Sequence, residues 1–200
     1  WRGDRVVGVH TSAGALEADV VVVAGGAWST LIKELGVPPD TVRPVRGQMI
    51  ELRVPKQLLR GMVEDERVYL SPRSDGRILV GSTLEDVGFE VGVTAGAVAE
   101  LLTAAVSLVP SLAAARFQQA WSGFRAATRD GLPILDRPAP GLVVAAGHHT
   151  NGIVLAPLTA EIVTALVLGD PPPVGLERYR LARLLARPAE SRPSAPQSSA

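Results

Sequence analysis

The stretch Val20-Val21-Val22-Val23-Ala24-Gly25-Gly26 holds four consecutive valines followed by a pair of glycines. An unbroken β-branched run bounded by glycine is typical of a strand buried on both faces, as in a parallel sheet. After it, Ser29 or Thr30 could cap a short helix that ends at Gly36, just before two prolines. The sequence therefore predicts a strand–turn–helix unit of an α/β fold near the start of the chain.

The region after residue 140 has the same character. Residues 141–146 form an apolar run that predicts another strand, and residues 153–168 predict an apolar helix ended by Gly169 and three prolines. A polar loop, Gly147-His148-His149-Thr150-Asn151-Gly152, lies between them. Residues 177–185 predict a last, surface helix. This half of the chain therefore returns to α/β architecture.

The middle of the chain predicts an antiparallel sheet. Four segments have the composition of strands: residues 45–53, 68–72, 77–83 and 117–124. The segment Arg73-Ser74-Asp75-Gly76 ends in Asp-Gly, a strong signal for a hairpin between two of them. Residues 94–109 carry aliphatic side chains at helical spacing and stop before Pro110.

The order α/β, antiparallel sheet, α/β predicts a mixed fold, α/β plus α+β. We expect the remnant of a dinucleotide-binding, Rossmann-like domain to flank an inserted antiparallel substrate-binding domain. The predicted boundaries are residues 1–42 and 139–186 for the two flanking pieces and 43–138 for the insertion. Residues 187–200 contain no large aliphatic side chain, which predicts a disordered tail.

Composition narrows the classes of function. Hydrophobic residues make up 46% of the 200 residues and charged residues 20%, which predicts a folded globular chain. Twenty basic side chains balance 20 acidic ones, so neither nucleic acid nor an anionic membrane is expected as a partner. No apolar run approaches the ~18 residues of a membrane span, so no membrane association is expected. With no cysteine and three histidines, a metal site is not expected either.

Two glycine-containing turns are candidate contact surfaces for a cofactor. Neither has the spacing G-x-G-x-x-G, which brings a pyrophosphate against backbone N–H groups. Residues 24–28 form either a tight strand–helix turn or a bare backbone on which a planar ligand lies. The loop 147–152 precedes a helix, whose partly positive N-terminus suits an electron-rich group such as the edge of a reduced flavin. A polar capping turn is the alternative there.

Arg125 and Tyr69 are candidate substrate contacts. Arg125 follows an aromatic segment, and a guanidinium matches a carboxylate in two-pronged geometry, although a surface salt bridge is the alternative. The Tyr69 hydroxyl could hold a substrate, or its ring could pack within the sheet. His148 and His149 are adjacent in the chain, so their side chains point apart and chelation of a metal is not expected.

Taken together and in order, these segments resemble the FAD-dependent D-amino-acid oxidase family, specifically its glycine oxidase branch. The resemblance covers about residues 1–185. The segments that carry it are VVAGGAWS (22–29), PVRGQ (44–48), VYLSPR (68–73), DGRILVGST (75–83), WSGFR (121–125), DGLP (130–133) and GHHTNGI (147–153).

The resemblance implies roles for individual residues. Arg125 would grip the substrate carboxylate, Tyr69 would sit over the substrate beside it, and Thr150 would face the substrate from the loop. The flavin of FAD would be lined by Gly25, Gly26, Ala27, Trp28, Arg46, Gly47, Gly123, Gly147, His148, Asn151, Gly152 and Ile153. No side chain would act as a catalytic acid or base, because the cofactor carries the difficult chemistry.

The implied reaction is the oxidative deamination of a small amino acid by molecular oxygen. An imine would form and hydrolyse to a 2-oxo acid and ammonia, with release of hydrogen peroxide. In this branch the reaction feeds synthesis of the thiamine thiazole. Thr150 and Leu84 stand where relatives in this branch tend to carry arginine and methionine, so glycine, sarcosine and a small D-amino acid all stay open as substrates.

The resemblance leaves one family segment without a counterpart, the G-x-G-x-x-G strand–turn–helix. We expect it to lie before Trp1, in a longer cytoplasmic protein, and without it the valine strand would have an unpaired edge. A non-catalytic fragment or binding subunit is one alternative, and a quinone-linked D-amino-acid dehydrogenase is another. A homo-oligomer also stays open.

Overall fold

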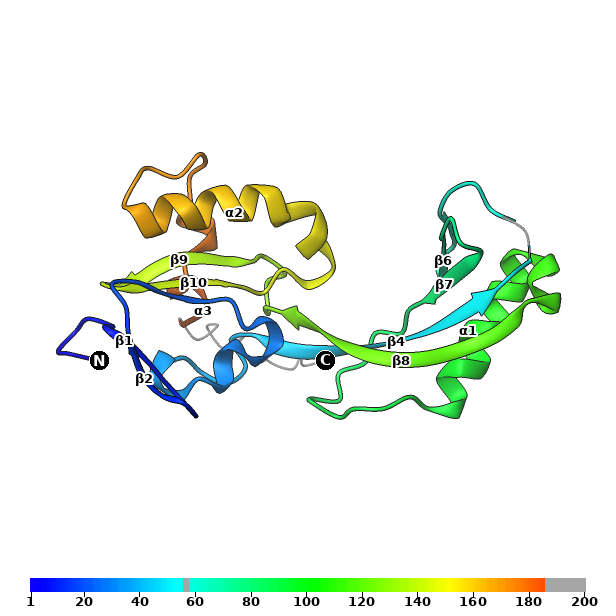
Figure 1. Ribbon diagram of the computed structural model, residues 1–200, viewed down its shortest axis with the longest axis horizontal. Coiled ribbons are helices and arrows are strands. Elements are labelled where there is room, and N and C mark those ends of the chain that lie inside the picture. Colours follow the sequence, from blue (N-terminus) through cyan, green and yellow to red (C-terminus); the bar gives the residue numbers. More distant parts are fainter. Residues whose placement is uncertain (56–57, 186–200) are drawn as a thin grey trace, which may run out of the picture.

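Two lobes joined by a pair of long strands make up the molecule in the computed structural model, which describes residues 1–55 and 58–185 (Figure 1). The mixed α/β and antiparallel architecture predicted from the sequence is confirmed. The tail predicted over residues 187–200 lies outside the described residues.

The first lobe is built on a three-stranded sheet with the order β3-β10-β9. Its strands are β3 (Val21–Val23), β10 (Leu142–Ala146) and β9 (Ile134–Ala139). β10 is buried along its whole length and pairs in parallel with β3 and antiparallel with β9. The valine run is therefore a parallel strand, as predicted.

β3 differs from the prediction in its burial. Val23 is buried, but Val22 is 40% exposed, so the strand is not covered on both faces. The reason is its position: β3 is an edge strand whose one partner, within residues 1–55 and 58–185, is β10. The unpaired edge that we expected for this strand is present.

The pairing of β9 differs from one predicted domain boundary. Residues 134–138 fall within the range 43–138 that we assigned to the inserted domain, yet they pair with β10 in the first lobe. Asp136 and Arg137 make this strand polar in sequence, which hid its pairing with the apolar β10.

The segment after β3 forms two short 3-10 helices, η1 (Gly26–Leu31) and η2 (Lys33–Leu35). Gly36 ends the second in the left-handed conformation, with φ of 67°, as a C-terminal glycine does. Ser29 and Thr30 do not cap this segment. They lie inside η1, and the residue at its N-cap is Gly25, which has no side chain to cap it.

Helix α2 (Gly152–Leu168) covers one face of the three-stranded sheet (Figure 1). Ile162 is its main buried contact and packs with Leu135 and Ala145. With the preceding turn, this apolar helical segment spans the 20 residues 149–168; its most apolar stretch of 18 residues has a mean hydropathy of 1.8 and is 11% buried. By length and composition this helix could cross a membrane, which corrects our expectation that no apolar run approaches that length.

The C-terminal segment returns along the other face of this sheet. The single helix predicted over residues 177–185 is instead two short elements, η5 (Glu177–Tyr179) and α3 (Ala182–Leu185). Arg180 between them is extended, and Leu181 N–H donates to the Asp136 carboxylate at 2.8 Å. This hydrogen bond and the burial of Leu181 and Leu184 stabilise the interrupted conformation over one continuous helix.

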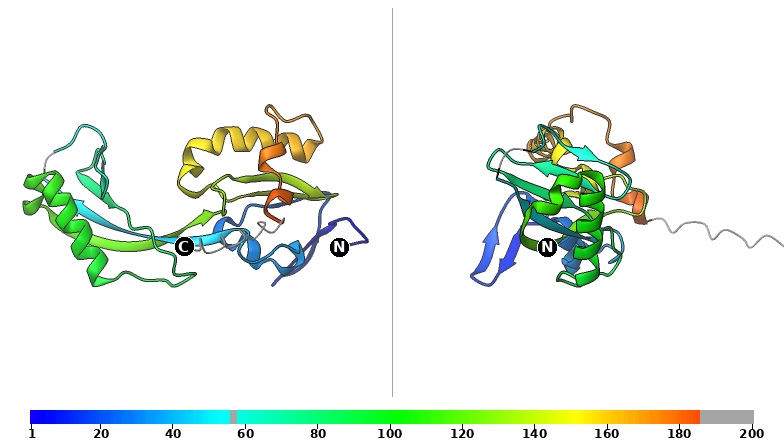
Figure 2. Two further views of the ribbon diagram at one scale, coloured as in Figure 1. Left: turned by 180° about the vertical axis from the view of Figure 1, so that it is seen from behind. Right: turned by 90° about the vertical axis from the view of Figure 1, so that its right-hand side faces the viewer.

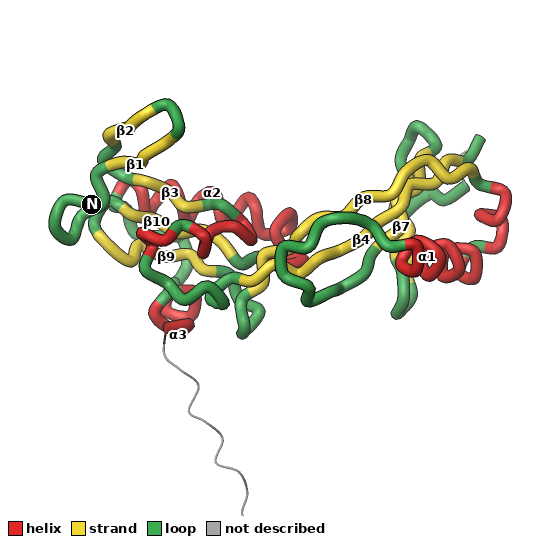
Figure 3. Tube along the Cα trace, turned by 90° about the horizontal axis from the view of Figure 1, so that it is seen from below, coloured by secondary structure: helices red, strands yellow, loops and turns green. Residues whose placement is uncertain are grey.

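The second lobe is an antiparallel sheet with the order β5-β6-β7-β4-β8. The strands are β5 (Val63–Glu64), β6 (Tyr69–Pro72), β7 (Arg77–Gly81), β4 (Arg43–Arg53) and β8 (Arg116–Ala127). The predicted Asp-Gly hairpin joins β6 to β7, and Gly76 has the left-handed φ of 85° that the turn needs. β4 and β8 extend beyond the other strands and reach the first lobe (Figure 3).

Helix α1 (Ala95–Leu108) covers one face of this sheet. Thr94 caps it, since its hydroxyl accepts a hydrogen bond from Ala97 N–H at 3.2 Å. Leu101 and Ala105 of the helix pack against Ile50, Leu70 and Val80 of three strands. A short 3-10 helix, η3 (Pro110–Ala114), then leads back to β8.

An exposed hairpin of β1 (Gly8–Thr11) and β2 (Gly14–Glu17) precedes β3. It stands apart from both larger sheets, as the side view shows (Figure 2). Most of the predicted site residues lie on the face of the five-stranded sheet that α1 leaves free, on the turn after β3 and on the turn that begins α2.

Candidate active site

Tyr69 and Arg125 lie on the same face of the five-stranded sheet, opposite α1. Side chains two residues apart on a strand share a face, and paired residues of neighbouring strands also do. Tyr69 pairs with Gly81, and Gly81 pairs with Met49, so these three residues form one row across the sheet. Arg125 pairs with Val45, four residues before Met49 on β4, and so projects from the same face.

A pair of glycines fills the intermediate row. Gly47 lies opposite Gly123, between the row of Arg125 and the row of Tyr69. Because neither residue has a side chain, the long Arg125 side chain can lean across this row toward the end of β7. Its guanidinium donates hydrogen bonds to the Ser82 hydroxyl and to the Thr83 carbonyl, the latter at 3.3 Å.

Arg125 has no acidic partner among the described residues. Both of its protein contacts are neutral oxygens, although a guanidinium carries five N–H donors. Six of the described arginines do have carboxylate partners, for example Arg183 with Asp130 at 2.7 Å. A half-buried guanidinium without a counter-charge is an attractive position for the carboxylate of a ligand.

The Tyr69 hydroxyl is also held in place. It donates to the Met49 sulfur at 3.6 Å, and Gly81 leaves room for the ring. A Cβ atom at Gly81 would lie 2.8 Å from the hydroxyl and 2.9 Å from the ring carbon that bears it. The absence of a side chain at position 81 is therefore what allows the phenol to lie flat against the sheet.

Tyr69 and Arg125 share one hollow with the turn that begins α2. This hollow has a volume of about 560 Å³, and Gly81, Ser82, His149, Thr150, Gly152 and Ile153 also line it. The structure thus brings together all three residues predicted to contact substrate: Tyr69, Arg125 and Thr150. Leu84 lies at the same hollow and is 64% exposed. On the side away from Arg125 the lining is charged, with residues 64–67.

A second hollow, of about 530 Å³, lies on the other side of Arg125. Most of its lining residues have small side chains or none: Ala24, Gly26, Ala27, Ala126, Ala145, Ala146, Gly147, Gly152, Ala156 and Ala160. Trp28 and Phe124 border it and are in contact with each other, with ring centroids 5.8 Å apart. A bare, largely apolar wall of this kind fits a flat ring system.

Three residues border both hollows: Arg125, His149 and Gly152. Gly152 is the first residue of α2, and the preceding Asn151 makes no side-chain cap. The backbone N–H groups of the first turn of α2 therefore have no side-chain cap from Asn151, and the helix dipole adds a partial positive charge there. The junction between the hollows is consequently an electropositive position.

His149 is a site residue that the predicted list did not include. Its backbone is left-handed, with φ of 49°, a conformation that non-glycine residues rarely adopt. Burial lowers the pKa of His149, and the charges of Arg125 and Arg43 lower it further. The imidazole is therefore neutral around pH 7. Its neighbour His148 lines the second hollow and bonds Thr159 at 3.0 Å, and burial lowers its pKa too.

Arg46 does not reach either hollow, contrary to the prediction that it lines the flavin. It lies on the α1 face of β4, because its neighbour Gly47 is on the opposite face. Its side chain is buried and donates to Glu85 at 2.9 Å. Burial raises the pKa of Glu85, but hydrogen bonds from Thr83, Arg46 and Gln48 outweigh that effect and lower it. This ion pair fixes the segment after β7, which carries the partners of Arg125.

The other residues predicted to line the cofactor divide into two groups. Gly26, Ala27, Trp28, Gly147, His148 and Gly152 border the second hollow, and Ile153 borders the first. Gly25, Gly47, Gly123 and Asn151 border neither hollow. Gly25 and Asn151 are the N-cap residues that precede η1 and α2, whereas Gly47 lies against the Arg125 guanidinium.

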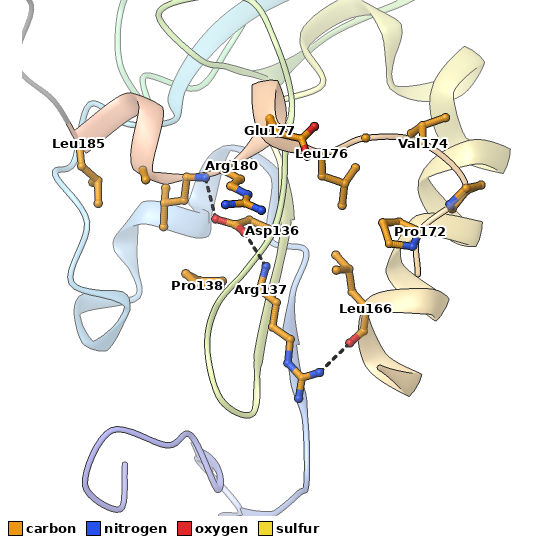
Figure 4. Close-up of a pocket in the computed structure, with 14 residues that line it drawn as sticks. Asp136, Arg137, Pro138, Leu166, Pro172, Val174, Leu176, Glu177, Arg180 and Leu185 are labelled. Carbon is orange, nitrogen blue, oxygen red and sulfur yellow. Dashed lines mark hydrogen bonds between the residues drawn. The ribbon is translucent and has the colours of Figure 1, made fainter. Parts of the chain in front are cut away.

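A larger hollow, of about 900 Å³, lies far from these residues, beneath the C-terminal segment (Figure 4). Its walls come from β9, the end of α2 and residues 172–185. The bonds across it are structural: Leu181 N–H to Asp136, and Arg137 to the Leu166 carbonyl at 3.2 Å. None of the predicted site residues lines it.

Residues 1–166 match the family described as DAO, FAD dependent oxidoreductase. The chain belongs to this family. It is 42% identical over 172 residues to glycine oxidase of Pseudomonas putida, a match that covers 84% of this chain and 47% of that protein. It is 40% identical to the bifunctional protein ThiO/ThiG of Nostoc sp., over 82% of this chain and 25% of that protein.

Solved structures agree with this family membership. The crystal structure of glycine oxidase from Geobacillus kaustophilus superposes with a TM-score of 0.82 at 39% identity. The superposition covers 87% of this chain and 48% of that one. L-proline dehydrogenase from P. horikoshii shares the fold, with a TM-score of 0.81 at 22% identity. The chain spans about half the length of the glycine oxidases that it matches.

Proposed function

We propose that this chain forms the substrate-facing half of an FAD-dependent enzyme that oxidatively deaminates a small amino acid. The observation that carries this proposal is Arg125: a half-buried guanidinium without a carboxylate partner among the described residues, in a hollow shared with Tyr69 and Thr150. An α-carboxylate would supply the missing counter-charge in two-pronged geometry. Family membership and the similarity to glycine oxidases support the reaction type.

The second hollow fits the flavin of FAD. Its wall of alanines and glycines would let a flat ring lie against backbone, with Trp28 at its border. The uncapped start of α2 would face the electron-rich edge of that ring. When bound, FAD supplies the hydride acceptor for the substrate α-carbon. The protein's part is to bind the carboxylate at Arg125 and so place the α-carbon between the two hollows.

The first hollow, of about 560 Å³, is lined by Tyr69, Arg125, Thr150 and Ile153 and by the charged residues 64–67. Glycine, sarcosine and a small D-amino acid are all small enough to enter it, and all stay open as substrates. The expected products, after water hydrolyses the imine, are the 2-oxo acid and hydrogen peroxide together with ammonia, or with methylamine where sarcosine is the substrate, and molecular oxygen is the electron acceptor.

We further propose that residues 1–200 function within a longer protein. β3 has an unpaired edge, and Ile153 and Val154 on the adjacent helix α2 are 92% and 81% exposed. When the next strands and helices of a parallel sheet are removed, an unpaired strand edge and apolar side chains become exposed. The predicted G-x-G-x-x-G unit is the segment that would cover them.

The test is to express the complete reading frame that contains these residues and to purify it under non-denaturing conditions. We expect a yellow protein that releases FAD on denaturation and produces peroxide with glycine, sarcosine or D-alanine. A colourless, inert full-length protein would contradict the enzyme proposal and favour a non-catalytic subunit. Turnover with a quinone but not with oxygen would instead favour the dehydrogenase alternative.

A role in synthesis of the thiamine thiazole, in the cytoplasm, is part of the same proposal. The similarity to ThiO/ThiG proteins supports it. A strain that lacks the reading frame should require the thiazole for growth, and the full-length gene should remove that requirement. Growth of the deletion strain without thiazole would separate this role from the oxidase activity itself.

A further inference from the structure

Gly47 was predicted to line the flavin, but its surroundings indicate a different role. It is buried in β4 and lies directly opposite Gly123 on β8. A Cβ atom at position 47 would lie 2.2 Å from Arg125 Nη1 and 2.8 Å from the guanidinium carbon. Both distances are far below van der Waals contact, so no side chain fits at position 47 while Arg125 keeps its position.

The two glycines of this pair are not equivalent. A Cβ atom at Gly123 meets nothing within 4 Å, whereas one at Gly47 collides with the guanidinium. The reason is the direction of the Arg125 side chain, which leans from β8 across to β4 and the end of β7. There it donates to the Ser82 hydroxyl and the Thr83 carbonyl.

A Cβ atom at position 47 would displace the Arg125 side chain and leave the backbone in place. The atoms that a Cβ would meet there belong to the far end of Arg125, which can swing outward by rotation about its own bonds. Elsewhere a glycine faces backbone: at Gly141 a Cβ would lie 2.1 Å from the Val6 carbonyl oxygen. Substitution of Gly47 should therefore displace the guanidinium and largely preserve the fold.

We propose that Gly47 is a positioning residue for the substrate carboxylate: its bare backbone forms the seat in which the Arg125 guanidinium lies. The inference rests on the proposed function, because it states which residue fixes the position of the Arg125 guanidinium and so the position of the bound substrate carboxylate. A guanidinium pushed out of this seat loses its bonds to Ser82 and Thr83 and no longer presents a fixed two-pronged face. Gly47 thereby determines affinity for the carboxylate and does so only through Arg125.

The experiment uses the full-length protein with Gly47→Ala, and with Gly96→Ala as the matched control. Gly96 lies in α1, where a Cβ meets nothing within 4 Å. We expect Gly47→Ala to raise KM for glycine about tenfold or more, the loss of one charge-assisted hydrogen bond, with a smaller change in kcat. Bound flavin, its absorption spectrum and the melting temperature should stay close to wild type. Gly96→Ala should leave KM unchanged.

A double-mutant cycle with Arg125→Met separates positioning from a general structural effect. Its readout is the dissociation constant of acetate, a carboxylate without an amino group, measured by calorimetry. In the Arg125→Met background, Gly47→Ala should produce no further loss, because the atoms it displaces are gone. An equal loss in both backgrounds, or an unchanged acetate affinity and KM in Gly47→Ala alone, overturns the proposal.

The same data distinguish this inference from the proposed function. A wild-type protein that binds neither acetate nor glycine contradicts the proposed function, and the role of Gly47 with it. A wild-type protein that binds both, beside a Gly47→Ala variant of equal affinity, contradicts the role of Gly47 alone. If Gly47→Ala unfolds the protein, the Arg125→Met/Gly47→Ala variant decides: it has no collision and should recover the melting temperature of Arg125→Met.

Discussion

The two lobes of this molecule differ in how completely they are covered. In the second lobe, α1 seals one face of a five-stranded sheet, and Ile50, Leu70 and Val80 have no measurable exposure. In the first lobe, β10 is equally buried, but β3 has an open edge and α2 exposes a row of aliphatic side chains. The difference lies at the outer boundary of the first lobe: within residues 1–55 and 58–185, β3 has a strand partner on one edge alone, and the outer side of α2 stays exposed.

The largest expected effect tests this contrast with one substitution at two places. Val80→Ala, in the sealed lobe, should lower the free energy of unfolding by about 2 kcal/mol through lost burial and a cavity. Val154→Ala, on the exposed face of α2, should change it by less than about 0.5 kcal/mol in the 200-residue chain. Urea denaturation of both variants measures the two values. A large loss from Val154→Ala would show that α2 is already covered.

The next effect concerns the sheet face that carries Arg125. Arg125→Met in the full-length protein should weaken carboxylate binding by about 1.5–2 kcal/mol, or roughly 10- to 30-fold in KM, because a charge-assisted pair is lost. Flavin content should remain that of the wild type, since the second hollow is lined mainly by small residues of the other lobe. Measured KM values with and without the substitution decide this. An unchanged KM would remove Arg125 from the site.

A third substitution sharpens the comparison at the open edge. Val22→Lys places a charge on the exposed face of β3, and charged side chains protect exposed strand edges against pairing with other chains. We expect the 200-residue chain to self-associate less, as measured by light scattering. In the full-length protein the same change should be destabilising, because the position is then covered. Equal behaviour in both proteins would contradict the proposal that a further segment packs here.

The smallest expected effect is a pKa shift at the junction of the hollows. Burial holds the pKa of His149 below its usual value of 6.5, and Arg125 and Arg43 lower it further. Arg125→Met removes one cation, so the His149 pKa should rise toward 6.5 while burial keeps it below. A lowered folded-state pKa means that stability is lost as pH falls through about 6.5, and the variant should lose less of it. NMR titration of the histidine resonances measures the shift.

The local elements of this fold were largely predictable from the sequence. The valine strand, the Asp-Gly hairpin and α1 each follow from patterns within a few residues, as does the C-terminal glycine of α2. Elements that depend on distant partners were not. Residues 177–185 favour one helix locally, but Asp136 and the buried Leu181 divide it. β9 was missed because its polar residues conceal a pairing that only β10 reveals.

The candidate site shows the same division. Tyr69, Arg125 and Thr150 were found through motifs, and the structure places them in one hollow. Arg46 was predicted to line the flavin from its motif, but a motif does not show which way a side chain alternates along its strand, and the Arg46 side chain lies on the α1 face. His149 lies within the motif GHHTNGI, but its position between the two hollows is visible only in the structure. The role inferred for Gly47 depends on the pairing of β4 with β8, which sequence patterns do not give.

The β4–β8 ladder is regular where residues 43–51 pair with residues 119–127, and this regular part sets how insertions and deletions within it would act. One extra residue in β8 before Arg125 would send its side chain to the α1 face, because strands alternate with a period of two. Two extra residues would restore the facing but carry the guanidinium about 6.8 Å along the sheet, beyond reach of Ser82 and Thr83. The distance between the Arg125 guanidinium and the second hollow is therefore set by a whole number of strand residues. Insertions and deletions can change this distance only in whole-residue steps, which are too coarse for gradual adjustment.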